Sequence, residues 1–454
     1  MTGANPGGRP VVDEARAAAA ATPTIVIGAY PRKAGAAAGT SRSPEARIDE
    51  AAGLARAIDL DVLDVELVLL GEIRPATYLG KGKVDEIAAQ VKEQDVRLVS
   101  MDCALSPVQQ RNLERAWDCK VIDRTGLILE IFGRRARTKE GALQVELAHL
   151  TYQRSRLVRS WTHLERQRGG FGFLGGPGET QIEIDRRLIQ ERISRIERDL
   201  EAVKKTRALH RASRRRTPYP IAALVGYTNA GKSTLFNRLA KSDVFAEDLL
   251  FATLDPTARA IKLPHGSRII LSDTVGFISD LPTMLVAAFR ATLEDVVEAN
   301  IILHVRDVAH EDSDAQAADV ESILRELGVA GEQAAPLIEV WNKIDLMAPE
   351  ARDTLIAKAA ARGNEPAAIA VSALTGEGAD RLLGAVEQAL SSQALTYVIT
   401  LSPEDGRGVS WLHERTEVLD RRSEPDGRQH LVVRVAPERR GRFEAKFPGA
   451  RLRQ

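Results

Sequence analysis

The chain has 454 residues, of which 44% are hydrophobic and 28% charged; these are ordinary values for a globular protein, and the length suits about three domains. Its two cysteines, Cys103 and Cys119, form no CxxC pair, so we expect neither disulfides nor a zinc site, and a reducing, cytoplasmic compartment. No apolar run of about 18 residues occurs, so we expect no membrane-spanning helix. This composition excludes a secreted miniprotein, a membrane protein and a wholly disordered chain.

The balanced total charge hides an uneven distribution. Lys plus Arg and Asp plus Glu each number 63, yet residues 111–216 carry 25 basic and 14 acidic residues. Residues 220–392 carry 14 basic and 25 acidic residues, and residues 393–454 carry 12 and 9. The net charges are thus +11, −11 and +3. The basic segment indicates contact with nucleic acid, although two solvated faces of opposite sign would give the same counts.

The first part of the chain alternates between short apolar runs and helical patterns. Residues 1–22 are rich in Ala, Gly and Pro and are expected to form a disordered tail. In residues 23–135 we expect strands at 25–27, 63–70, 96–101 and 119–122, and helices at 83–91 and 106–117. Strands that alternate with helices favour a small α/β domain with a mostly parallel sheet.

Residues 136–217 show two long helical patterns around the glycine-rich tip at 169–178. Apolar residues recur there at steps of three, four or seven: Leu143, Leu147, Leu150, Leu157, Trp161 and Leu164, then Ile182, Ile189, Ile193, Ile196, Leu200 and Val203. This spacing predicts an antiparallel helical hairpin. Ten arginines between positions 154 and 198, with Phe171 and Phe173 at the tip, suit RNA phosphates and unpaired bases. Packing of these helices against the acidic segment is the alternative.

The remaining chain divides at residue 392. Residues 218–392 again alternate between apolar runs and helical patterns, which predicts a second α/β domain. In residues 393–454 we expect a strand at 396–401, a helix at 408–419 and a strand at 430–435. This order indicates a small α+β domain.

A phosphate-binding pattern opens the acidic segment. After the apolar run 221–225 come Gly226, Tyr227, Thr228, Asn229, Ala230, Gly231, Lys232, Ser233 and Thr234. They fit GxxxxGK followed by Ser or Thr, between a strand and a helix, as a phosphate loop requires. Glycines let successive N–H groups face the phosphates, Lys232 can reach the β- and γ-phosphates, and the Ser233 hydroxyl can ligate Mg²⁺.

Three further motifs follow apolar runs in the order that a guanine-nucleotide site needs. They are Asp273, Thr274, Val275 and Gly276 (DxxG), Asn342, Lys343, Ile344 and Asp345 (NKxD), and Ser372, Ala373 and Leu374. Asp273 can hold Mg²⁺ through water, and the Gly276 N–H can contact a γ-phosphate. Asp345 can accept from guanine N1–H and its 2-amino group, which adenine cannot match, and a backbone N–H of the last loop can bind guanine O6.

The metal site needs one more hydroxyl from a first switch loop. We expect this loop at Phe251, Ala252, Thr253, Leu254 and Asp255. Thr253 is the candidate ligand, together with Ser233 and Asp273. The motifs therefore predict a GTP-binding, GTP-hydrolysing protein with Mg²⁺ as cofactor.

Four longer phrases resemble the HflX family of GTPases: Leu79–Ile87, Asp123–Leu129, Gly172–Gln181 and Asp273–Ile278. The likeness covers roughly residues 24–390. It implies a P-loop GTPase domain of the α/β class at 218–392, preceded by the small α/β domain and the hairpin and followed by the α+β domain. It also implies a cytoplasmic GTPase that binds the large ribosomal subunit and its RNA, and that splits or recycles stalled ribosomes under stress. We expect a monomer, without DNA or integral-membrane contact.

The residue after DxxG is unusual for a switch GTPase. Many such proteins have a glutamine there that orients the attacking water, whereas this chain has Phe277. A phenylalanine is similar to the HflX pattern but cannot position water, so we assign no catalytic residue and expect slow intrinsic hydrolysis that ribosomes stimulate. An RNA-binding or assembly module with GTP as a structural switch is the alternative function. A second nucleotide site at Lys81–Lys83 is a weaker one, because the GxxxxGK pattern is missing there.

Overall fold

A computed structural model describes most of the chain. It covers residues 21–32, 42–136, 138–167, 177–214, 219–241, 251, 257–280, 293–329, 335–361, 367–392, 395–424, 427–435 and 437–452. The predicted tail, apart from residues 21 and 22, and the hairpin tip at 169–176 lie outside these residues. Two compact units divide the chain, Met1–Arg134 with Tyr152–Arg186 and Arg135–Thr151 with Arg187–Gln454.

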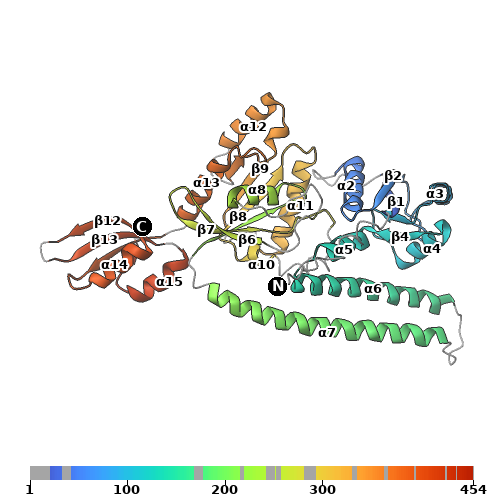
Figure 1. The fold of residues 1–454 in the computed structure, drawn as a ribbon, viewed down its shortest axis with the longest axis horizontal. Coiled ribbons are helices and arrows are strands. Elements are labelled where there is room, and N and C mark those ends of the chain that lie inside the picture. The colour runs from blue at the N-terminus through green and yellow to red at the C-terminus, as the bar shows by residue number, and fades with distance from the viewer. Residues whose placement is uncertain are drawn as a thin grey trace, which may run out of the picture. The chain divides into compact units, whose positions relative to one another are not determined.

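A parallel sheet in the order β2-β1-β3-β4 forms the centre of the N-terminal part (Figure 1). Its strands are β1 (Pro23–Pro31), β2 (Asp61–Leu70), β3 (Leu98–Met101) and β4 (Lys120–Asp123). Helices α3 (Lys81–Glu93) and α4 (Pro107–Trp117) pack on one face, and α2 (Pro44–Arg56) packs on the other. Because helices cover both faces, β1 is buried along nearly its whole length, which explains its unbroken apolar sequence. The predicted parallel α/β arrangement is confirmed.

Two helices of this part were not predicted, α2 and α5 (Arg124–Arg135). Helix α2 carries local start signals, because Ser43 caps it through the Ala46 N–H and Pro44 stands in its first turn. Helix α5 begins directly at the end of β4. The Asp123 side chain accepts the Gly126 N–H at 2.9 Å, so one residue ends the strand and caps the helix.

Asp123 also joins the parallel sheet to the helix α6 (Lys139–Gln167). Its buried carboxylate accepts the Tyr152 hydroxyl and the Arg156 guanidinium, both at 2.5 Å. A Cβ on Gly126 would lie 2.8 Å from Ile122 Cγ1 and 3.3 Å from the Tyr152 hydroxyl. The glycine therefore leaves the room in which Tyr152 reaches Asp123.

The two predicted long helices are present as α6 and α7 (Pro177–Arg214). Arg192 of α7 pairs with Glu146 of α6 at 2.6 Å, as an antiparallel hairpin requires. The α7 prediction is confirmed at Ile193, Ile196 and Leu200, which are buried.

The predicted set of apolar core positions on α6 is wrong in detail. In the part of α6 whose side chains the structure describes, the buried positions are Gly141, Gln144, Val145 and Ala148, whereas Leu143, Leu147 and Leu150 are only half-buried. The buried residues recur at steps of three and four, so they form one face of the helix, and that face is rotated away from the predicted leucines. The side chains of the predicted Trp161 and Leu164 lie outside the described residues.

A six-stranded sheet in the order β10-β9-β8-β5-β7-β6 follows, antiparallel only at β6. Its strands are β5 (Ile221–Gly226), β6 (Thr257–Lys262), β7 (Arg268–Asp273), β8 (Ile301–Asp307), β9 (Leu337–Asn342) and β10 (Ala367–Ala370). The helices are α8 (Lys232–Ala240), α10 (Glu294–Val297), α11 (Ser313–Glu326), α12 (Pro349–Ala361) and α13 (Ala379–Ser392), with the 3₁₀ turn η1 (Ile344–Leu346). Helices α8 and α13 cover one face, and the carboxyl ends of the parallel strands meet at one edge (Figure 1).

The last part is an antiparallel sheet, β12-β13-β11-β14, with two helices on one face. The elements are β11 (Leu395–Leu401), α14 (Gly406–Arg415), β12 (Glu417–Ser423), β13 (Gln429–Val435), α15 (Pro437–Lys446) and β14 (Arg451–Leu452). The predicted helix at 408–419 is wrong at its end, because α14 stops at Arg415. From Glu417 onward the chain pairs with β13, and this pairing between strands overrides the helical pattern.

Candidate functional site

The loop between β5 and α8 has a backbone that only small residues allow. Gly226 has φ +155°, and a Cβ there would lie 2.2 Å from the Val305 carbonyl oxygen. Gly231 has φ +88°, and its Cβ would lie 2.2 Å from Asn342 Nδ2. Asn229 between them also has a positive φ, 59°. The loop therefore curls tightly over the amino end of α8, the geometry in which backbone N–H groups face an anion.

Lys232 lies buried at the start of α8. Its ammonium donates to the Gly226 and Tyr227 carbonyl oxygens at 3.1 and 2.7 Å. Burial lowers the pKa of Lys232 to about 8, although the Asp273 carboxylate opposes this change. Phosphate oxygens at this loop would favour the charged form of the lysine.

Ser233 and Asp273 meet beside the loop. The Ser233 hydroxyl donates to Asp273 Oδ2 at 2.7 Å, and the Asp273 carboxylate is fully buried at the end of β7. A hydroxyl and a carboxylate are the hard oxygen donors that Mg²⁺ prefers, so these residues fit the expected ion. Among the described residues no three His, Cys, Asp or Glu side chains gather to hold a metal. Next in the chain, the Thr274 hydroxyl donates to the Leu224 carbonyl oxygen at 2.6 Å.

The chain after Asp273 is hydrogen-bonded to the phosphate loop. Thr228 N–H donates to the Phe277 carbonyl oxygen at 2.7 Å, and Phe277 N–H donates to the Gly226 carbonyl oxygen at 3.1 Å. Ser279 N–H donates to the Tyr227 hydroxyl at 2.8 Å. Gly276 fits between them, because a Cβ there would lie 2.9 Å from Thr228 Cγ2. The sequence motifs did not predict these hydrogen bonds between the phosphate loop and the chain after Asp273.

The NKxD motif stands at the end of β9. Asn342 is buried and joins two loops, because its Nδ2 donates to the Ala230 carbonyl oxygen at 2.8 Å and its Oδ1 accepts the Ala373 N–H at 2.9 Å. Lys343 pairs with Asp307 at 2.8 Å. Ile344 is buried, and Asp345 is partly exposed.

The Ser372–Leu374 loop lies beside the phosphate-loop helix. Ser372 is buried and its hydroxyl oxygen accepts the Thr375 N–H at 3.1 Å, whereas Leu374 is exposed. Arg238 of α8 donates to the carbonyl oxygens of Ala373, at 3.2 Å, and of Leu374. No sequence motif indicated this arginine.

The structure brings together most of the predicted site. The phosphate loop, DxxG, NKxD and the last loop all gather at the carboxyl edge of the six-stranded sheet. Of the first switch loop, Phe251 is buried with φ 58°. Ala252, Thr253, Leu254 and Asp255 lie outside the described residues.

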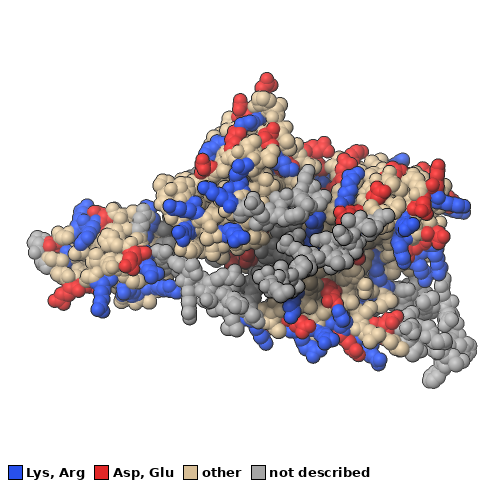
Figure 2. Space-filling model, viewed as in Figure 1, with Lys and Arg blue, Asp and Glu red and all other residues tan. Residues whose placement is uncertain are grey.

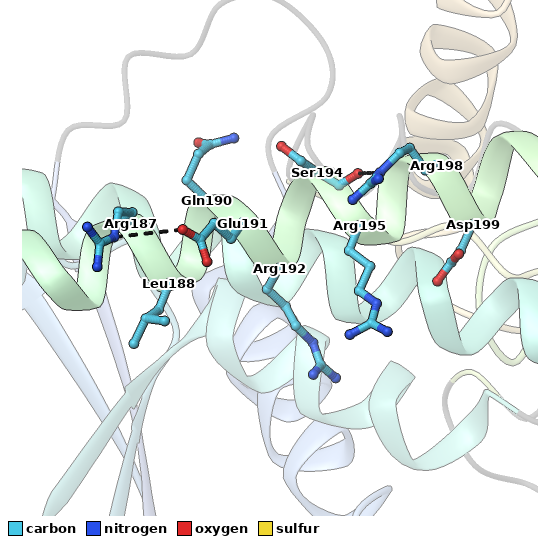
Figure 3. A pocket seen from close by; sticks show the side chains of 9 residues that line it. All are labelled: Arg187, Leu188, Gln190, Glu191, Arg192, Ser194, Arg195, Arg198 and Asp199. Carbon is cyan, nitrogen blue, oxygen red and sulfur yellow. Dashed lines mark hydrogen bonds and ion pairs between the residues drawn. The ribbon is translucent and has the colours of Figure 1, made fainter.

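A second feature of interest is an open hollow along one side of α7 (Figure 3). Its lining residues are Arg187, Leu188, Gln190, Glu191, Arg192, Ser194, Arg195, Arg198 and Asp199. Arg192 and Arg195 project from the same side of the helix. Basic side chains (Lys and Arg) and acidic side chains also intermingle at the lower edge of Figure 2, where α7 lies.

Four family models match the chain in order. They describe the "GTP-binding GTPase N-terminal" region at 45–133, the "GTP-binding GTPase Middle Region" at 135–214, a "50S ribosome-binding GTPase" at 221–343 and the "HflX C-terminal domain" at 354–450. Together they span most of the sequence, from the parallel sheet to the last antiparallel one.

Curated relatives extend over nearly the same range. The chain is 50% identical over 399 residues to the GTPase HflX of Magnetococcus marinus, covering 88% of this chain and 90% of that protein. It is 46% identical over 361 residues to the GTPase HflX of Escherichia coli K12, covering 80% and 83%. Among solved structures, a complex of SsGBP with GDP matches with a TM-score of 0.47 at 23% identity, over 81% of this chain and 98% of that one. In the described residues no helix is long and apolar enough to cross a membrane.

Proposed function

The chain belongs to the HflX family of GTPases, and we propose that its GTP cycle controls binding to the large ribosomal subunit. It is a GTP-binding protein that hydrolyses GTP to GDP and phosphate. The proposed outcome of the cycle is the splitting or recycling of stalled ribosomes under stress, in the cytoplasm. The observation that carries this proposal is the union of a phosphate loop in contact with DxxG and NKxD with an exposed arginine row on α7.

The phosphates and Mg²⁺ are assigned to the loop after β5 and to DxxG. In this proposal the backbone N–H groups of residues 226–234 surround the phosphates, and the Lys232 ammonium neutralises them. Ser233 and Thr253 would ligate Mg²⁺ directly and Asp273 through water, and the bound ion would neutralise charge that develops on the phosphates. The Ser233–Asp273 contact of 2.7 Å supports the pairing of these two groups.

The base is assigned to the loops after β9 and β10. Asp345 would accept guanine N1–H and the 2-amino group, and Lys343 would cover the ring. Asn342 stabilises this site, because its side chain is hydrogen-bonded both to the Ala230 carbonyl oxygen of the phosphate loop and to the Ala373 N–H.

Hydrolysis by the free protein is proposed to be slow. Phe277 occupies the position of the usual water-orienting glutamine, and its side chain is buried with 1% exposure. It can neither polarise nor position a water molecule. A group supplied by the ribosome would then lower the barrier, as partner groups do in other GTPases.

The proposed RNA surface is the row Arg187, Arg195 and Arg198 on α7, whose side chains are exposed. Arginines along one helix can neutralise successive phosphates, so binding should fall steeply as salt rises. Arg192 on the same helix is different, because it pairs with Glu146 of the other helix at 2.6 Å, whereas the ion pair of Arg187, with Glu191 at 3.7 Å, stays within α7. This contrast provides a matched control.

The test is sedimentation of the protein with large ribosomal subunits, in a GTP analogue and in GDP. We expect binding with the analogue, and at least a tenfold loss when Arg187, Arg195 and Arg198 are all replaced by Gln. Arg192→Gln should instead lower thermal stability and spare subunit binding. Replacement of residues 171–178 by a serine linker should abolish ribosome-stimulated hydrolysis while GTP affinity is kept. Unchanged binding of the triple variant would contradict the proposed surface.

The alternative function, an RNA-binding module with GTP as a structural switch, predicts a different pattern. Under that alternative, RNA affinity follows the nucleotide state, but subunits do not accelerate hydrolysis. Measuring subunit affinity and hydrolysis rate in the same titration separates the two functions.

A further inference from the structure

Arg238 lies on α8, the helix that begins at Lys232, and it contacts the loop at Ser372–Leu374, which is distant from it in sequence. Its Nε donates to the Ala373 carbonyl oxygen at 3.2 Å, and its Nη2 donates to the Leu374 carbonyl oxygen. Both bonds come from one planar guanidinium, whose fixed fork matches two adjacent acceptors. One surface side chain of α8 thus holds two consecutive peptide groups of another loop.

Holding these oxygens also sets the direction of an N–H. In a planar trans peptide, the carbonyl oxygen and the N–H of the next residue point in opposite directions. Because Arg238 draws the Ala373 oxygen toward α8, the Leu374 N–H must point away from that helix. The contact between Arg238 and the Ala373 carbonyl oxygen therefore fixes the orientation of the Leu374 N–H, which belongs to the same peptide group.

The neighbouring N–H groups are already used inside the protein. Ala373 N–H donates to Asn342 Oδ1 at 2.9 Å, and Thr375 N–H donates to Ser372 Oγ at 3.1 Å. Within the described part of the chain, the Leu374 N–H is the one of these three donors that has no acceptor. It is the donor left for a ligand.

The rest of the loop is built to stay in this conformation. Ser372 N–H donates to the Glu377 carbonyl oxygen at 2.9 Å, and the Glu377 carboxylate pairs with Arg352. Gly376 has φ +91°, and a Cβ there would lie 3.7 Å from the Arg238 guanidinium carbon. The positive φ favours glycine at this turn, and with the loop already held in one conformation, binding would cost little further ordering.

We propose that Arg238 is a positioning residue for base recognition, which turns the Leu374 N–H toward guanine O6. This inference rests on the proposed nucleotide site. Guanine has an acceptor at position 6, whereas adenine has an amino donor there that the same N–H would repel. Arg238 would act through the loop and not touch the base.

The test measures three nucleotides against Arg238→Met, by competition with a fluorescent GDP. GDP and inosine diphosphate both carry O6, and 2-aminopurine riboside diphosphate lacks it. We expect the affinities of Arg238→Met for GDP and inosine diphosphate to fall by the same factor, about fivefold to tenfold. This factor corresponds to the free energy of one hydrogen bond. The affinity for the 2-aminopurine nucleotide should change less than twofold. Arg238→Lys keeps the charge without the fork and should fall between the wild type and Arg238→Met.

Lys241→Met, at the end of the same helix, is the matched control and should leave all three affinities within twofold. For Arg238→Met the KM for GTP should rise by the same factor as the dissociation constant for GDP, with kcat changed less than twofold. The inference would be overturned if the affinity for the 2-aminopurine nucleotide fell by the same factor as that for GDP, or if the affinity for GDP did not fall. If the wild-type protein itself does not prefer GDP over the 2-aminopurine nucleotide, the proposed base site fails instead.

Discussion

Replacing Asn342 tests whether one buried side chain aligns the phosphate loop with the base loops. Asn342 is 1% exposed and makes two hydrogen bonds, to the Ala230 carbonyl oxygen at 2.8 Å and from the Ala373 N–H at 2.9 Å. Asn342→Ala removes both and leaves two backbone groups without partners. Each unsatisfied group costs about 1–3 kcal/mol, so the local stability should fall by about 2–6 kcal/mol.

The assay is native-state hydrogen exchange of the β5 and β9 amides, because a chain of several domains does not unfold in one step. Affinity for GDP, measured by calorimetry, should weaken at least tenfold, since the two halves of the site lose their alignment. Asn300→Ala is the control: Asn300 Oδ1 accepts the Ile221 N–H at 2.8 Å, at the opposite end of β5. It should cost about 1 kcal/mol and leave GDP affinity unchanged. A loss below about 1 kcal/mol for Asn342→Ala, with normal GDP affinity, would refute the reasoning.

Four further outcomes are expected. Asp345→Asn should lower the affinity for GTP and favour xanthosine nucleotides. Unchanged GTP affinity would contradict the assignment of Asp345 to the guanine base. The pKa of Lys232, lowered to about 8 by burial, should rise when phosphates bind; affinity for GDP should be flat below pH 8 and fall above it, with proton uptake measured by calorimetry in two buffers at pH 8.5. Phe277→Gln should not accelerate intrinsic hydrolysis in a phosphate-release assay, because the side chain is buried. Gly126→Ala should speed hydrogen exchange in residues 152–157, because its Cβ would crowd Ile122 and the Tyr152 hydroxyl; unchanged exchange would argue against the Asp123 contact as the link.

The nucleotide motifs and most strands could be predicted because their signals are local. GxxxxGK needs its glycines within a few residues, and Gly226 and Gly231 have the positive φ values that this pattern implies. The parallel sheet at the N-terminus was predictable from apolar runs alternating with helical patterns. Helix α2 could have been found too, from Ser43 and Pro44.

Other features could not be predicted, because they depend on residues far apart in the chain. The end of α14 was misplaced since pairing with β13 decides it. The apolar repeat of α6 did not show that Gly141, Gln144, Val145 and Ala148 would be buried, because burial depends on what covers each side of a helix.

By itself, the sequence determined that a strand, a glycine loop and a helix would follow one another in the order of a phosphate loop, and that NKxD would follow another strand. These are statements about neighbouring residues, whose backbone conformations steric limits restrict. Only the tertiary structure decided that Asn342 joins Ala230 to Ala373, and that Arg238 holds the Ala373 and Leu374 carbonyl oxygens. Those bonds exist because strand order in the sheet brings together loops that are more than a hundred residues apart, and hydrogen bonds require their atoms to lie within about 3 Å.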